Sequence, residues 1–384
     1  MTTTNQHRGR PDWLPADWSA AAATAAAAAV AFSLLGHTPV VRALGLALAV
    51  AGVALALQRF GRLLATAGGL ALAFSPAFWS QTGGSSQPTL DLILLGLVAA
   101  AAAAVLVAAI ARRPAAGLWA GLILFSAFFW LLVGTPRSLR LTTLLASWLL
   151  FLLTDALLVA NPRPGDGGSP KLQPHHAPGL LLLFGLGVFN DPLFVLFGPA
   201  LALGLALCRA RLPAGYWLAL GLLIGIGIYG ITTQYLISGW WNYSARQADE
   251  LGIRVPYVLA DGWREATRWL NLFALVAGQF TPIGVILGIV GLARLARWYP
   301  PLGVVTMVAY AAYTIFGLVY FGQDSAVLLL PLLMIQVIWM TYAVYAVSQW
   351  LQHSFRATTL SRWLAPAAFC LLPLALLLRI TGVA

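Results

Sequence analysis

Residues 90–111 read LDLILLGLVAAAAAAVLVAAIA, a long and almost uninterrupted apolar run. Its one charged residue is Asp91, and as an α-helix it would rise about 33 Å. The hydrocarbon core of a bilayer is about 30 Å thick, and about 20 apolar residues cross it. These residues therefore predict a transmembrane helix.

The rest of the chain has the same character. Of its 384 residues, 60% are hydrophobic and 9% are charged, whereas about 25% are charged in a soluble domain. This composition excludes an ordinary water-soluble enzyme. We predict an all-α polytopic membrane helix bundle of about 12–13 transmembrane segments, with residues 1–18 as a cytoplasmic tail and 19–384 as one transmembrane domain. The other predicted spans are 19–36, 40–57, 63–79, 115–135, 139–160, 179–207, 214–238, 271–293, 302–320, 326–349 and 363–381.

The net charge of +11 does not indicate nucleic-acid binding, which needs basic residues gathered on one solvated face. The arginines come in ones and twos at the ends of apolar runs, as in Arg112 and Arg113. At these positions the arginines follow the positive-inside rule, by which cytoplasmic loops are rich in basic residues. They predict a multi-pass protein of the cell membrane with a cytoplasmic N-terminus. The first apolar run also resembles a signal peptide, but Asp12 and Asp17 interrupt its charged region and favour a retained helix.

One predicted span is too long for a single crossing. A straight helix over 179–207 would measure about 44 Å, and its middle reads Asn190-Asp191-Pro192. A single crossing would also place Arg209 and Arg211 outside, against the positive-inside rule. Two half-helices that rise and return satisfy the length, the proline and the arginines together.

The loop 239–270 combines aromatic and charged residues. Trp263 and Trp269 fall on one side of a short amphipathic helix beginning near Asp261, with Arg264 and Arg268 on the other. Such a helix lies in the plane of the lipid headgroups. It serves either as an interfacial anchor or as a lid over a lipid-linked substrate.

Polar residues collect on the predicted outer face. They are His37, Asp91, Asn190, Asp191 and Asp324. Carboxylates at membrane depth are costly and indicate function. Asp191 can cap the returning half-helix, contact a substrate, or do both. The two cysteines and the dispersed histidines predict no disulfide framework and no metal site.

Three stretches carry a resemblance. Residues 74–81 read FSPAFWSQ, residues 184–191 read FGLGVFND with FGPAL at 197–201, and Asp324 precedes an aromatic-bearing helix that begins LPL at 330–332. In these stretches the chain resembles bacterial relatives of the transmembrane protein O-mannosyltransferases, within the GT-C glycosyltransferase superfamily. The resemblance covers about residues 63–345 and implies a GT-C-like fold.

The resemblance implies transfer of a sugar from a polyprenyl-phosphate donor at the outer membrane face, without a cofactor. A carboxylate then accepts the proton of the acceptor hydroxyl, and cationic or polar groups hold the phosphate. The loops 36–39 and 83–89 hold no carboxylate where the resemblance implies one. The candidate catalytic residues are therefore Asp91, Asp191 and Asp324. The candidate substrate-binding residues are His37, Asn190, Arg246, Arg254 and Arg264.

Two other classes of function stay open. The chain can be a non-catalytic integral membrane subunit that keeps the scaffold, with membrane lipid and other membrane proteins as its partners. It can also be a transporter, which needs a polar path through the middle of the membrane, and only Asn190 and Asp191 hint at one.

Overall fold

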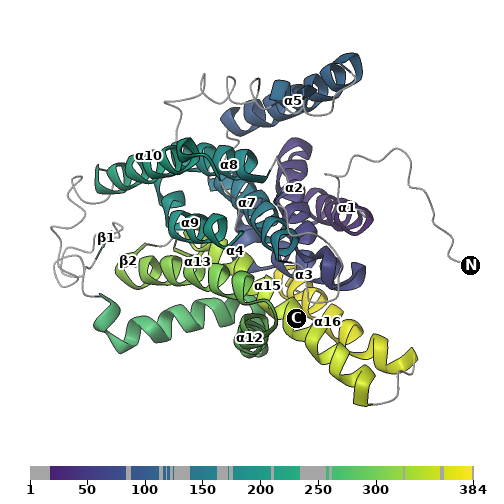
Figure 1. Ribbon diagram of the computed structural model, residues 1–384. Helices are drawn as coiled ribbons and strands as arrows, with labels where there is room; N and C mark the ends of the chain where they lie inside the picture. Colours follow the sequence, from purple (N-terminus) through teal and green to yellow (C-terminus); the bar gives the residue numbers. More distant parts are fainter. Residues whose placement is uncertain are drawn as a thin grey trace, which may run out of the picture.

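A computed structural model describes residues 18–83, 88–111, 116–117, 119–121, 124, 139–161, 172, 176–208, 212–233, 257–258, 262–322, 325–354 and 359–382. Within these ranges the chain is an all-α bundle with one pair of two-residue strands (Figure 1). The α-helices are α1 (Ser19–Leu34), α2 (Val40–Leu57), α3 (Arg62–Ala73), α4 (Pro76–Trp79), α5 (Pro88–Ala111), α7 (Leu139–Ala160), α8 (His176–Asn190), α9 (Gly198–Leu207), α10 (Ala214–Ile231), α12 (Ala266–Trp298), α13 (Pro300–Val319), α14 (Ser325–Leu328), α15 (Leu330–Ser354) and α16 (Thr359–Ile380). The 3-10 helices are η1 (Gln58–Phe60), η2 (Ser80–Thr82), η3 (Pro192–Phe197) and η5 (Gly262–Arg264), and the strands are β1 (Tyr257–Val258) and β2 (Tyr320–Phe321).

The polytopic character is confirmed. The described residues hold seven helices long and apolar enough to cross a membrane, or eight if the bent pair α3–α4 is one span. The predicted span 63–79 is bent by 63° between Arg62–Ala73 and Pro76–Thr82, because Pro76 cannot continue α3. The predicted first span is a helix of only 16 residues. Most of 115–135 lies outside the described residues.

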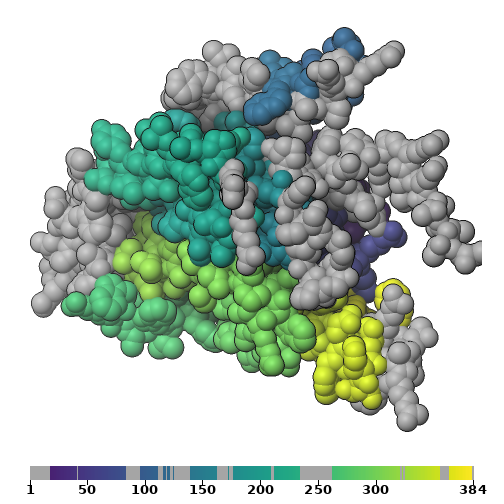
Figure 2. Space-filling model, in the orientation of Figure 1, coloured from purple at the N-terminus to yellow at the C-terminus, as the bar shows by residue number. Residues whose placement is uncertain are grey.

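The centre of the bundle is α15. Every residue from Leu330 to Val344 is buried, as expected of a helix that is apolar on all sides and surrounded by others. At the surface, α10 buries only Leu220 and Gly227, and Figure 2 shows it in teal along the upper left of the molecule. Apolar side chains exposed on such a helix are suited to contact with lipid.

The predicted half-helix pair is confirmed. The chain breaks at Asp191 between α8 and η3. His176, where α8 begins, lies beside Asp155 of α7, and Leu207, where α9 ends, accepts a hydrogen bond from Asn161. Both ends of the pair are therefore close to the same end of α7, and the chain reverses between them.

These contacts define two ends of the bundle. At the Asp191 end, Thr142 of α7 bonds to Asp191, and Leu193 of η3 forms an apolar cluster with Tyr320 and Leu328. At the opposite end, called the Asp155 end, α7 meets the start of α8 and the end of α9. Which end faces the cytoplasm stays a prediction.

Helix α12 is bent in the middle. Phe280 and Thr281 have non-helical backbone angles, and Thr281 has a positive φ of 65°, which is rare for a β-branched residue. Pro282 follows and has no N–H to bond to Gly278. Residues 266–279 form the near half and 282–298 the far half, and Figure 1 shows the two halves pointing in different directions.

Candidate functional site

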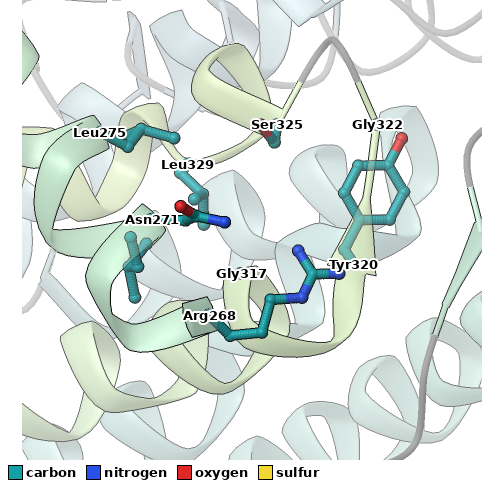
Figure 3. Close-up of a pocket in the computed structure, with 9 residues that line it drawn as sticks. Arg268, Asn271, Leu275, Gly317, Tyr320, Gly322, Ser325 and Leu329 are labelled. Carbon is teal, nitrogen blue, oxygen red and sulfur yellow. The ribbon is translucent and has the colours of Figure 1, made fainter. Parts of the chain in front are cut away.

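A pocket of about 270 Å³ lies at the Asp191 end, between the near half of α12 and the end of α13. Cationic, amide, hydroxyl and aliphatic groups line it, so one ligand could make polar and apolar contacts. Figure 3 shows eight of the lining residues by label. The lining residues are Arg268, Asn271, Leu272, Leu275, Gly317, Tyr320, Gly322, Ser325 and Leu329.

One wall of the pocket is a single face of α12. Asn271, Leu272 and Leu275 follow Arg268 by three, four and seven residues, which is the spacing of one helical face. The side chain of Arg268 reaches across the pocket toward Tyr320 (Figure 3). The opposite face of the helix is exposed, with Trp269 among its residues.

Arg268 is the most distinctive group in the pocket, because it is only 9% exposed. A guanidinium removed from water attracts an anion more strongly than a solvated one does, since its surroundings screen the charge less. Its planar set of donors also matches the geometry of phosphate and carboxylate groups. The pocket is therefore suited to an anionic group.

The other wall is set by α13 and the residues after it. Tyr320 is buried and stacks on Phe316, with ring centroids 5.0 Å apart and planes 18° from parallel. Gly317 leaves room for Leu272 and Leu329, because a Cβ at this position would meet them at 3.3 and 3.0 Å. This wall is held by packing within the bundle.

The predicted site residues Asn190 and Asp191 belong to a structural network outside the pocket. Asp191 is 1% exposed, and its carboxylate accepts hydrogen bonds from the backbone N–H of Leu193 at 3.1 Å and the hydroxyl of Thr142 at 3.3 Å. Asn190 donates to the same hydroxyl at 2.8 Å. The capping interpretation of Asp191 is confirmed. These groups lie at the end of α7, so they form no polar path through its middle.

Two arginines that we did not predict as site residues hold the segment after residue 79. Arg42 of α2 donates to the carbonyls of Thr82 and Gly83, each at 3.2 Å. Arg140 of α7 donates to the carbonyls of Gln81 at 2.9 Å and Gly83 at 2.7 Å. These carbonyls end η2 and have no partner within the helix. Arg42 and Arg140 therefore position a loop.

The remaining predicted residues lie elsewhere or outside the described residues. His37 is exposed and lies outside the pocket. Arg264 is exposed, with its guanidinium carbon 5.0 Å from the ring centroid of Trp263. Asp91 lies in the first turns of α5, where only the backbone is described. Arg246, Arg254 and Asp324 fall outside the described residues.

The predicted separate interfacial helix is wrong in part. The helix begins at Ala266 with Glu265 at its N-cap position and continues into α12, while Asp261 lies outside the described residues. Trp263 and Trp269 are exposed, and their predicted contact with lipid stays a prediction. Arg268 is buried in the pocket, whereas the sequence placed it at the polar surface. The sequence held an indication of this burial, because Asn271, Leu272 and Leu275 continue the helical face that begins at Arg268 and also line the pocket.

The opposite end of the bundle holds an ionic cluster. Asp155 pairs with Arg59 at 2.8 Å and with the buried His176 at 3.1 Å. These contacts join α7 to η1 and α8, and we assign them a structural role. Within the described ranges, no three His, Cys, Asp or Glu side chains form a group that could hold a metal ion.

Comparison with family models, with curated proteins and with solved structures finds no match to this chain.

Proposed function

We propose that the chain is a GT-C-like membrane glycosyltransferase, or a diverged descendant of one, and that its pocket holds the phosphate of a polyprenyl-phosphate sugar. The observation that carries the proposal is the buried Arg268 in a pocket whose other lining is partly apolar. An amphiphile with an anionic head fits such a lining, because its phosphate meets the guanidinium while its hydrocarbon contacts Leu272, Leu275 and Leu329.

In the proposed reaction the oxygen of an acceptor hydroxyl attacks the anomeric carbon of the sugar. The bond from that carbon to the phosphate oxygen breaks, and the polyprenyl phosphate leaves with the bonding electron pair. Arg268 stabilises the charge that develops on the phosphate. The predicted base is Asp324, which would take the proton from the hydroxyl. In the chain it falls between Gly322 and Ser325, which both line the pocket.

Binding is the first test. Purified protein in lipid nanodiscs is titrated with a polyprenyl phosphate, inorganic phosphate and an uncharged polyprenol. We expect the polyprenyl phosphate to bind most tightly. Arg268→Gln should weaken it by about 10-fold to 100-fold, the range for a lost hydrogen bond to a charged group, and Arg268→Lys should weaken it less. Arg297→Gln is the matched control, because Arg297 is an exposed arginine of α12 that does not line the pocket.

Turnover is the second test. Release of polyprenyl phosphate from a set of polyprenyl-phosphate sugars, each supplied with a set of hydroxyl acceptors, is measured for the wild type and for Asp324→Asn. We expect release by the wild type and a loss of at least about 100-fold in the variant, the contribution typical of a general base. In the binding test, equal affinities for the polyprenyl phosphate and the uncharged polyprenol would refute the assigned role of Arg268.

A non-catalytic membrane subunit is the second candidate. The observation that favours it is the structural use of Asn190 and Asp191, two predicted site residues that hold the reversal between α8 and η3. Wild-type protein that binds polyprenyl phosphate but releases none from any of the polyprenyl-phosphate sugars would support this candidate.

A further inference from the structure

The two halves of α12 are held very differently. The far half packs on α15 through glycines: a Cβ on Gly288 would stand 2.0 Å from the side-chain amide nitrogen of Gln336, and one on Gly291 would stand 1.8 Å from the backbone carbonyl oxygen of Trp339. The close approach of the two backbones at Gly291 fixes one helix against the other. In the near half only Arg268, Val276 and Gln279 are buried.

Hydrogen bonds from two other parts of the chain hold the residues just before the bend. In a straight helix the N–H of residue 282 would donate to the carbonyl of Gly278, but Pro282 has no N–H. The guanidinium of Arg379, in the last turn of α16, donates to this carbonyl at 2.8 Å. On the other side, the side-chain oxygen of Gln279 accepts a hydrogen bond from the backbone N–H of Ala77 at 2.7 Å. The near half is thus fastened to the bundle at the bend.

The near half also carries one wall of the pocket, while α13 and the residues that follow it carry the other. Arg268 lies 12 residues before Phe280, a distance of about 18 Å along the helix. A change of about 10° in the bend would therefore move Arg268 by about 3 Å. Hydrogen bonds tolerate only a few tenths of an ångström, so the angle of the bend decides whether Arg268 can bind a ligand.

We propose that α12 is hinged at 280–281 and that Arg379 is a positioning residue, which sets the angle of the near half and so the width of the pocket. Arg379 does not line the pocket and acts through the Gly278 carbonyl. Thr281, with its positive φ, is the residue that absorbs the change of direction. The inference rests on the proposed function only for the identity of the ligand.

The hinge is tested by a distance within α12, measured without ligand. Spin labels are placed at Phe273→Cys and Ile286→Cys, which are exposed sites on the two halves, after Cys208 and Cys370 are replaced by alanine. Pro282→Ala restores the missing N–H, so the distance should lengthen toward the straight-helix value, about 20 Å between the backbones. We expect Arg379→Gln to broaden or shift the wild-type distance distribution, and Arg379→Lys to preserve it.

The double variant Pro282→Ala/Arg379→Gln gives the most decisive test of the hinge. In Pro282→Ala the Gly278 carbonyl has a partner within the helix, so adding Arg379→Gln should change nothing further. Arg297→Gln, an exposed arginine of the far half, is the matched control and should leave the distances unchanged. A distance distribution that Arg379→Gln leaves unchanged, or shifts equally with and without Pro282, would overturn the proposal.

Ligand binding provides an independent measurement. We expect Arg379→Gln to weaken polyprenyl phosphate binding by about tenfold, because hydrogen bonds to the phosphate depend on the position of Arg268. The double variant Pro282→Ala/Arg379→Gln should bind polyprenyl phosphate as tightly as Pro282→Ala alone. Unaltered affinity in Arg379→Gln would overturn the link to the pocket. If the wild type binds no polyprenyl phosphate, the proposed function fails, and the spin-label distances alone decide on the hinge.

Discussion

Replacing Gly291 with alanine should force α12 and α15 apart. The added Cβ would stand 1.8 Å from the carbonyl oxygen of Trp339, and ordinary van der Waals contact begins at 3.4 Å. The gap must therefore open by about 1.6 Å, judged against this ordinary contact distance. The obstructing atom belongs to the backbone of α15, whose residues from Leu330 to Val344 are all buried, so no side-chain rotation relieves the overlap.

The change in the free energy of unfolding caused by Gly291→Ala combines two opposing effects. Overpacking of a close interface costs about 1–3 kcal/mol, while alanine is favoured over glycine inside a helix by about 0.5–1 kcal/mol. Gly278→Ala, in the same helix, is the matched control because a Cβ at Gly278 meets nothing within 4 Å. The helix-propensity gain is common to both variants, so their difference, about 1–3 kcal/mol, measures the overlap.

The assay is thermal unfolding in detergent micelles, followed by tryptophan fluorescence. We expect Gly291→Ala to lower the apparent melting temperature by several degrees and Gly278→Ala to leave it unchanged or raise it slightly. Equal melting temperatures for the two variants would refute the close approach of α12 to α15, and with it the fixed far half on which the hinge depends.

Three further predictions concern other parts of the bundle. Thr142→Val should destabilise the protein by about 1–3 kcal/mol in thermal unfolding, because buried Asp191 loses a hydrogen bond. Asp155→Asn should lower the melting temperature more than Arg59→Gln does, since Arg59 is 46% exposed and its ion pair is worth at most about 1 kcal/mol. A cysteine at position 211 should react with a membrane-impermeant maleimide only after the cells are opened, and rapid labelling of intact cells would contradict the predicted orientation.

The positions of most helices along the chain follow from local sequence patterns. Apolar runs of membrane length become helices because their backbone groups have no other partners in lipid, and the predicted span 139–160 is α7 to the residue. The break at 190–192 was also predictable, since the segment 179–207 is too long for one crossing and contains Pro192. These features depend on residues close together in the chain.

The tertiary structure alone decided which polar residues meet. Gln279 and Ala77 are 202 residues apart in the chain, and Arg379 and Gly278 are 101 residues apart, so no local pattern couples them. Asp191 caps η3 through a local bond that the sequence also predicted, whereas its bond to Thr142, 49 residues away in the chain, is set by tertiary packing. Arg268, placed at the polar surface by helical periodicity, became the buried cation of the pocket, because the end of α13 lies against the same face of α12. Periodicity assigns a residue to one face of a helix, and only packing decides what that face contacts.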